Sequence, residues 1–277
     1  MDRRQPAGRY GRMWLRSALI SLALALPVSA RADPVEVDVE LFLAVDVSRS
    51  MSPQELEIQR RGYAAALSDP EVIDVIAGGM IGRIALTYVE WAGDSSQTVI
   101  VPWTLIDGPE AGQSVADRLT AWFSNGMRRT SIAGVLDYAA DAFETNSYTG
   151  LRRVIDVSGD GPNNQGRPVL DARADVLARG ITINGLPLMT QDAFSLRWGI
   201  PDLDAYYLNC VIGGTGAFVL PVLSWDQFAD SVKRKLILEI AARPAPAPPE
   251  RIMKAQGYDC LIGEKKWESN QFDFNSP

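Results

Sequence analysis

The feature that most constrains the fold is an apolar run that ends in a short polar loop and leads into a helix start. Residues 35–45 (VEVDVELFLAV) alternate at first and then become continuously apolar, which predicts a strand buried on both faces. The loop that follows reads Asp46-Val47-Ser48-Arg49-Ser50. Ser52-Pro53-Gln54-Glu55 then forms a capping box with proline at the first helical position. This order of strand, loop and helix is typical of parallel sheets that are covered by helices.

The rest of the chain continues the alternation of strands and helices. Further strands are expected at residues 83–92, 98–105, 153–158, 181–186 and 217–222, and helices at 110–123, 131–143, 168–179 and after residue 224. A hairpin-like turn at residues 93–96 and Pro102 predict that the strand at 98–105 is antiparallel and lies at an edge. The sequence therefore predicts an α/β fold with a mostly parallel sheet and helices on both faces.

The first 32 residues are interpreted as a signal peptide, because five arginines precede a short apolar run at 18–26 and small residues follow it. Cleavage is expected after Ala30 or Ala32, which predicts a periplasmic or secreted protein. The α/β domain is assigned to residues 33–242, a proline-rich linker to 243–251 and a C-terminal tail to 252–277. No membrane span is expected in the mature chain.

Composition excludes several classes of function. The chain contains no histidine, which excludes Ser-His-Asp and Cys-His catalysis and histidine-based zinc sites. Residues 1–32 hold six arginines and one aspartate, so the mature chain carries a net charge of −12. That sign is opposite to the charge of a typical nucleic-acid-binding domain, so no nucleic-acid partner is expected. The two cysteines, Cys210 and Cys260, either pair in an oxidising compartment and tie the tail to the domain, or are unrelated thiols.

Five side chains with hydroxyl or carboxylate oxygens are expected at the carboxyl edge of the sheet, where functional groups gather in parallel α/β folds. Asp46, Ser48 and Ser50 follow the first strand, Thr130 precedes the helix at 131–143, and Asp160 follows the strand at 153–158. These residues offer only oxygen ligands, the set that hard cations such as Mg²⁺, Mn²⁺ and Ca²⁺ prefer. With few carboxylates in contact, such an ion would accept an acidic oxygen from outside.

The order Asp46-x-Ser48-x-Ser50, Thr130 and Asp160-Gly161 resembles the metal-ion-dependent adhesion site (MIDAS) of von Willebrand factor A (vWA) domains. The resemblance extends over about residues 37–241. The segments LAVDVSRSMS, YVEWAG, RRTSIAGVL, DVSGDGPNNQG and ITINGLPL are similar to a bacterial exported subfamily of unknown function, DUF1194. The resemblance implies a Rossmann-like three-layer sandwich with a six-stranded sheet in the order 3-2-1-4-5-6.

The resemblance also implies roles for the five residues. Ser48, Ser50 and Thr130 would contact the metal directly, and Asp46 and Asp160 would act directly or through water. Mg²⁺ is the usual ion, and it ligates an acidic group of a partner. One departure is the pair Arg128-Arg129, which stands where many members of the family have two glycines. These cations would repel a metal ion unless they point outward to meet an acidic ligand.

Three further residues near the predicted strand ends have structural interpretations. Asp156 is interpreted as the partner of Arg152 or Arg153 in a buried ion pair, with a role behind the metal site as the alternative. Glu90 is expected to be a solvated strand end and Trp91 a packing residue.

Taken together, the residues predict an exported, metal-dependent module that binds a carboxylate of a protein or small ligand, and not an enzyme. Two alternatives stay open. One is a metal-dependent hydrolase such as a phosphoesterase, although Ser48 stands where aspartyl phosphatases have a second carboxylate. The other is a metal-free scaffold of the same fold in which the hydroxyls only cap loops.

Overall fold

A computed structural model describes the chain except for residues 2–32, 122–125, 191–198, 242–256 and 276–277. The interpreted signal peptide and the proline-rich linker therefore lie outside the described residues, as does the start of the C-terminal tail. The chain divides into two units, Met1–Asp33 and Pro34–Pro277. Every helix and strand below belongs to the second unit.

The sheet has five strands in the order β3-β2-β1-β4-β5. β1 (Val35–Asp46) is central and pairs in parallel with β2 (Ile84–Trp91) and with β4 (Tyr148–Gly159). β4 also pairs in parallel with β5 (Thr182–Pro187). β3 (Gln97–Ile106) is antiparallel to β2 and forms one edge, which confirms the hairpin prediction. Residues 37–46 of β1 are all buried, as expected for a strand that is covered on both faces.

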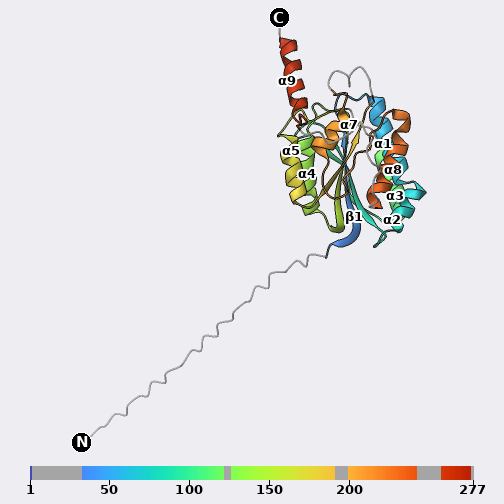
Figure 1. The fold of residues 1–277 in the computed structure, drawn as a ribbon. Coiled ribbons are helices and arrows are strands. Elements are labelled where there is room, and N and C mark those ends of the chain that lie inside the picture. The colour runs from blue at the N-terminus through green and yellow to red at the C-terminus, as the bar shows by residue number, and fades with distance from the viewer. Residues whose placement is uncertain (2–32, 122–125, 191–198, 242–256, 276–277) are drawn as a thin grey trace. The chain divides into compact units, whose positions relative to one another are not determined.

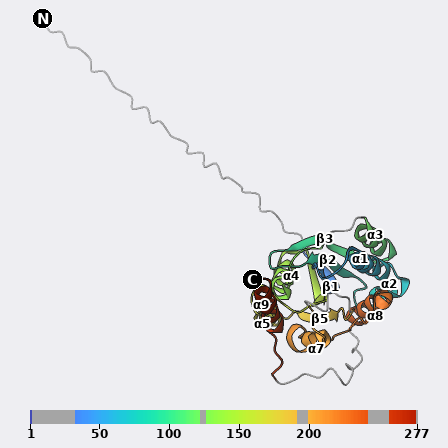
Figure 2. The ribbon, with the colours of Figure 1, turned by 90° about the horizontal axis from the view of Figure 1, so that it is seen from above.

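Helices cover both faces of this sheet (Figures 1 and 2). One hydrophobic core contains Leu41 and Leu43 of β1, and the other contains Phe42 and Ala44. The first face carries α1 (Pro53–Leu67), α2 (Pro70–Ala77), α3 (Pro109–Thr120) and α8 (Phe228–Ile240). The second carries α4 (Ile132–Thr145), α5 (Val169–Ala178), α7 (Leu203–Tyr206) and the π-helix η1 (Tyr207–Val211). A short 3₁₀ helix, η2 (Trp225–Gln227), precedes α8, and α9 (Ile262–Asn275) follows Cys260.

The start of α1 follows the predicted capping box. The Ser52 hydroxyl accepts a 3.3 Å hydrogen bond from the Glu55 N–H, and the Ser52 N–H donates a 2.7 Å bond to the Glu55 carboxylate. Two otherwise unpaired backbone donors are satisfied in this way. The chain therefore leaves β1, makes one short loop and enters α1, and this path holds residues 46–51 at the carboxyl edge of the sheet.

The predicted six-stranded order is wrong for the described residues, because residues 217–222 do not form a sixth strand. They form only isolated bridges, one between Val219 and Gly185 of β5 and one between Val222 and Leu188, the residue after β5. The Leu220 N–H donates to the Gly185 carbonyl (3.0 Å) and the Val222 N–H to the Pro187 carbonyl (3.0 Å). In a continuous parallel ladder of this register, the N–H of residue 187 would donate a hydrogen bond to the Leu220 carbonyl. Proline has no N–H, so this bond cannot form. Pro187 therefore interrupts the ladder at its middle.

Candidate metal centre

The polar loops predicted to form the site meet at the carboxyl edge of the sheet. Val45 of β1 lies opposite Ser158 of β4, so the residues that follow these two strands emerge side by side. The loop after β1 also contacts the segment before α4, where the Met127 N–H donates a 2.8 Å hydrogen bond to the Val47 carbonyl. Parallel pairing thus brings together three segments that are distant in sequence.

Two serines and one aspartate form a hydrogen-bonded cluster at this edge. The hydroxyls of Ser48 and Ser50 lie 2.8 Å apart. Ser50 donates a 2.8 Å hydrogen bond to Asp160 Oδ1, and Ser48 donates a longer one of 3.5 Å to the same atom. Three of the five predicted ligands therefore place their oxygens around one point.

Asp46 is completely buried and contacts this cluster through the backbone of Ser48. Its Oδ1 accepts a 2.7 Å hydrogen bond from the Ser48 N–H, whereas its Oδ2 is buried without a hydrogen-bond partner. Burial, followed by the negative charge of Asp160, raises the pKa of Asp46 well above its usual value. Two neighbouring carboxylates in a buried position require a positive charge if both are ionised. A divalent cation held by oxygen ligands fits this arrangement.

Thr130 joins the site through the loop that follows Asp160. Its N–H donates a 3.0 Å hydrogen bond to the Asn164 side chain, and its carbonyl accepts a 2.8 Å bond from the Asn164 N–H. The next residue, Ser131, caps α4 by accepting a bond from the Gly134 N–H. Asn164 thus holds Thr130 at the helix entry, facing the same pocket as the two serines.

A pocket of about 340 Å³ opens above these residues. Its wall combines uncharged hydroxyls with three arginines and one aromatic ring. The lining residues are Ser48, Arg49, Ser50, Arg128, Arg129, Thr130, Asn164 and Trp267. The pair Arg128-Arg129, noted as a departure from the family pattern, therefore borders the pocket.

Gly159, the last residue of β4, allows the site to be this compact. A Cβ atom at this position would lie 2.8 Å from Tyr207 Oη and 3.0 Å from Asp46 Oδ2. The Tyr207 hydroxyl is buried and has no hydrogen-bond partner in the structure. Burial first, and then the charges of Asp46 and Asp160, raise the pKa of Tyr207 well above its usual value. Tyr207 is therefore a neutral phenol packed behind the two carboxylates.

Sequence reasoning did not identify several residues that hold the site. The Gln59 side chain on α1 donates a 3.1 Å hydrogen bond to the Asp46 carbonyl. Asn163 is fully buried; its Oδ1 accepts from the Ala133 N–H (3.0 Å), and its own N–H donates to the Tyr206 hydroxyl (3.2 Å). Asn163 thus binds the loop that follows Asp160 to α4 and α7. A pair of asparagines beside glycine and proline is equally typical of an ordinary turn, so the sequence did not separate these roles.

The prediction that Asp156 pairs with Arg152 or Arg153 is wrong. Its Oδ1 lies 2.6 Å from the ammonium group of Lys235 on α8. Arg152 instead donates to the carbonyls of Glu239 (3.0 Å) and Ile240 (2.9 Å). Residues four apart on a strand share a face but are separated by about 13 Å, and residues three apart face opposite ways. A cation on the same strand therefore could not reach Asp156.

Glu90 is not a solvated strand end, because only 2% of it is exposed. Its carboxylate forms a 2.5 Å ion pair with the buried Arg60 of α1, which lies over this end of β2. Trp91 is completely buried, in agreement with the packing role expected for it.

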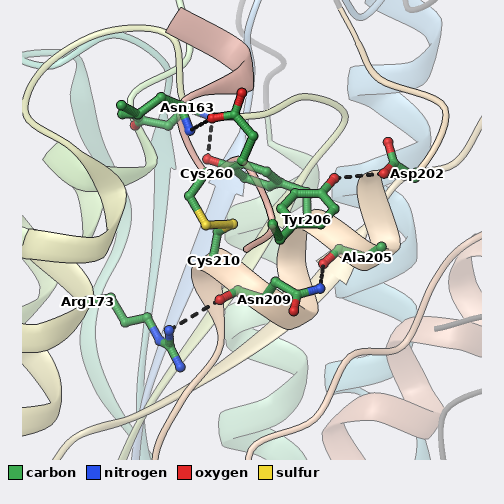
Figure 3. Close-up of a disulfide and its surroundings, with 11 residues drawn as sticks. Asn163, Arg173, Asp202, Ala205, Tyr206, Asn209, Cys210 and Cys260 are labelled. Carbon is green, nitrogen blue, oxygen red and sulfur yellow. Dashed lines mark hydrogen bonds between the residues drawn. A yellow bond between two sulfur atoms is a disulfide. The ribbon is translucent and has the colours of Figure 1, made fainter. Parts of the chain in front are cut away.

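Cys210 and Cys260 form a disulfide with their Cα atoms 5.6 Å apart, which confirms one of the two readings of these residues. Figure 3 shows this bond below Asn163 and next to Tyr206, so it joins the tail to the domain beside the loop that follows Asp160.

Within the described ranges, no helix is long and apolar enough to cross a membrane. In the same ranges, no three Asp, Glu, Cys or His side chains form a metal cluster, so hydroxyls would have to complete any ligand set at the site.

Comparison with solved structures gives the class of the fold. The proximal thread matrix protein 1 of the mussel byssus, solved with a zinc-occupied MIDAS motif, is 14% identical with a TM-score of 0.55, and the match covers 76% of this chain and 49% of that chain. The pilus adhesin SpaC of Lactobacillus rhamnosus GG is 11% identical with a TM-score of 0.53, covering 75% and 31%. A von Willebrand factor type A structure from Catenulispora acidiphila is 16% identical with a TM-score of 0.46, covering 74% and 43%.

The likenesses to the mussel protein and to SpaC, with the sheet order and the two helical layers, define a vWA-like α/β fold. The family described as "Protein of unknown function (DUF1194)" matches residues 36–244, and the chain belongs to this family. The chain spans less than half the length of the three solved structures. No curated protein matches it. At these identities the comparisons establish the fold, and the site has to be argued from the residues of this chain.

Proposed function

We propose that the chain is an exported binding module in which Asp46, Ser48, Ser50, Thr130 and Asp160 hold one divalent cation. Mg²⁺ is the first candidate, with Mn²⁺ and Ca²⁺ as alternatives, since all three prefer oxygen ligands. The ion would use an open position to ligate a carboxylate of a partner protein or small ligand. We propose binding rather than catalysis, because the sequence supplies no histidine and no recognisable nucleophile and base.

The observation that carries this proposal is the buried Oδ2 of Asp46, which has no hydrogen-bond partner and lies near a second carboxylate. Leaving a buried acceptor without a partner is costly, and leaving two such charges together costs more. A cation bound among the hydroxyls of Ser48 and Ser50 would remove both penalties. The zinc-occupied motif of the mussel protein supports the idea that this fold can hold a divalent ion.

Export is supported by two independent features. The interpreted leader at residues 1–32 directs the chain out of the cytoplasm. The Cys210–Cys260 disulfide is of a kind that persists in oxidising compartments.

Isothermal titration of the oxidised protein with Mg²⁺ and Mn²⁺ tests the proposal. We expect one ion per chain, and we expect Ser50→Ala and Asp160→Asn to abolish or strongly weaken binding. Ser147→Ala is the matched control, because Ser147 is exposed and its carbonyl pairs with the start of β1, at the opposite edge of the sheet. At an ion concentration of about 100 times Kd, bound metal should raise the free energy of unfolding by about 2.7 kcal/mol, and EDTA should reverse this.

Two results would replace the proposal with an alternative. If neither ion binds and EDTA leaves the melting temperature unchanged, the chain is a metal-free scaffold. If a panel of phosphoesters is hydrolysed in the presence of Mg²⁺ and this turnover is lost in Asp46→Asn, the chain is a hydrolase.

A further inference from the structure

The pocket above the candidate metal centre has a positively charged rim on an otherwise acidic protein. Arg49, Arg128 and Arg129 all line it, and the chain as a whole has a net charge of −7. Among the described residues, no carboxylate pairs with any of these three guanidinium groups. The carboxylates of Asp46 and Asp160 accept hydrogen bonds from Ser48 and Ser50, which line the same pocket. With a divalent cation bound, the charges of these two aspartates would be neutralised, and the rim would remain positive.

Arg129 is held in a specific position over this pocket. Its φ of 75° is in the left-handed region, and no other non-glycine residue in the described ranges has a positive φ. Its guanidinium carbon lies 3.6 Å from the centroid of the Trp267 ring, which is a cation–π arrangement. A backbone conformation that side chains disfavour persists only where the surroundings stabilise it, and such residues concentrate at binding sites.

Trp267 belongs to α9, which lies outside the region matched by the family model. One contact joins the start of α9 to η1, and two contacts attach α9 to the loop that follows Asp160. The disulfide fixes its start, and Asn163 donates a 2.7 Å hydrogen bond to Glu264 (Figure 3 shows the Asn163 side of this contact). At Gly263 the backbones approach so closely that a Cβ atom would lie 2.0 Å from the Asn163 carbonyl oxygen. The helix is therefore docked tightly, and Trp267 reaches the pocket as a consequence.

We propose that the disulfide-tethered helix α9 is a wall of the binding site, and that with Arg128 and Arg129 it selects ligands carrying two carboxylates a few ångströms apart. This inference rests on the proposed function: one carboxylate would ligate the ion, and the second would meet the arginine pair. The arginines donate paired hydrogen bonds in a fork that matches a carboxylate. Trp267 keeps the Arg129 guanidinium facing the ligand. Two sources present this chemistry, a small dicarboxylic acid and a protein segment with adjacent acidic side chains.

Calorimetric titration of the full, oxidised chain in saturating Mg²⁺ tests the inference. The probes are acetate, glutarate and the blocked tetrapeptides Gly-Asp-Gly-Gly and Gly-Asp-Asp-Gly. We expect at least one two-carboxylate probe to bind about tenfold more tightly than its one-carboxylate counterpart. A preference for glutarate identifies a small acid as the source, and a preference for the Asp-Asp peptide identifies a protein segment. Either result supports the inference, and equal affinities within both pairs of probes would overturn it.

Variants then assign the preference to the proposed wall. Arg128→Gln is expected to remove most of the tenfold preference, because it removes one guanidinium group that is proposed to meet the second carboxylate. Gly263→Leu is expected to have the same effect without substituting any pocket residue, because it forces α9, and with it Trp267, away from Asn163. The controls are Arg234→Gln on α8 and Glu268→Ala on α9, two exposed residues that do not line the pocket. Retention of the full preference in both Arg128→Gln and Gly263→Leu would overturn the inference.

The Mg²⁺ titration without any acid separates this inference from the proposed function. If wild type and the rim variants all bind Mg²⁺ normally but show no two-carboxylate preference, only the wall proposal fails. If wild type binds no metal, the proposed function fails and the wall proposal fails with it. Because a rim arginine repels the ion, Arg128→Gln is expected to bind Mg²⁺ at least as tightly as wild type.

Discussion

Replacing Lys235 with methionine is expected to destabilise the domain, and more strongly at alkaline than at acidic pH. The Lys235 side chain is completely buried, and its Nζ lies 2.6 Å from Asp156 Oδ1 and also contacts the carboxylate of Glu239. The Asn184 amide donates a further 2.9 Å hydrogen bond to Glu239. The substitution therefore leaves two buried carboxylates without their cation. Removal of one member of a buried ion pair costs about 3–5 kcal/mol of unfolding free energy.

The pH dependence follows from the pKa of Asp156. Burial and the charge of Glu239 raise this pKa to about 7, against 3.8 for an unperturbed aspartate, while Lys235 lowers it. Between these two values the folded state holds a proton that the unfolded state has released, so the free energy of unfolding falls as pH rises through this window. One such proton contributes a slope of at most about 1.4 kcal/mol per pH unit. Without Lys235 the pKa rises further, and the loss of stability continues to higher pH.

Urea unfolding followed by far-UV circular dichroism at about pH 5 and about pH 8 measures both effects. Lys233→Met is the matched control. It lies two residues earlier on α8, its side chain is 30% exposed, and it pairs with Asp69 and Glu71 at the surface. Exposed pairs of this kind contribute about 0–1 kcal/mol. The reasoning is refuted if Lys235→Met costs no more than Lys233→Met at pH 8, or if its cost is the same at both pH values.

Three further predictions concern other parts of the structure. Gly159→Ala should lower the free energy of unfolding by about 1–3 kcal/mol and weaken Mg²⁺ binding, because the new Cβ would lie 2.8 Å from Tyr207 Oη. Urea-unfolding and Mg²⁺-titration curves of the variant that match those of wild type would contradict this. Reduction of the Cys210–Cys260 disulfide, whose cysteines are 50 residues apart, should lower the free energy of unfolding by about 4 kcal/mol through loop entropy; an unchanged thermal melt in dithiothreitol would count against it. Pro187→Ala should create an amide at position 187 that is protected from hydrogen exchange by the Leu220 carbonyl, and fast exchange there would show that proline is not what interrupts the ladder.

Local signals predicted the central part of the fold well. β1 and α1 are encoded by a continuous apolar run and a capping box, both of which act over a few residues. The convergence of Asp46, Ser48 and Asp160 also followed from the sequence, because the ends of neighbouring parallel strands must lie side by side. By contrast, helix α2 was not predicted, although Asp69-Pro70-Glu71 supplies an N-cap, a proline at the first helical position and an acidic first turn.

Features that depend on distant partners were not predicted. Glu90 is buried because Arg60, thirty residues earlier, covers it, and the cation that pairs with the buried Asp156 is Lys235 of α8 and not an arginine of its own strand. The break in the expected sixth strand originates at Pro187, in the strand beside it. In each case the two interacting residues are distant in sequence, and no local sequence pattern indicates that they pair. Only the tertiary structure shows these contacts.

The disulfide affects how this protein is best studied in the laboratory. A fragment cut at residue 244, the end of the family match, lacks Cys260 and leaves Cys210 as a buried thiol. It also lacks Glu264, the hydrogen-bond partner of the Asn163 side chain in the loop after Asp160. Such a fragment would lack Trp267 from the pocket wall and would therefore have an altered entrance to its pocket. Screens for ligands should therefore use the oxidised chain through α9, because a negative result from the shorter piece would describe the truncation and not the protein.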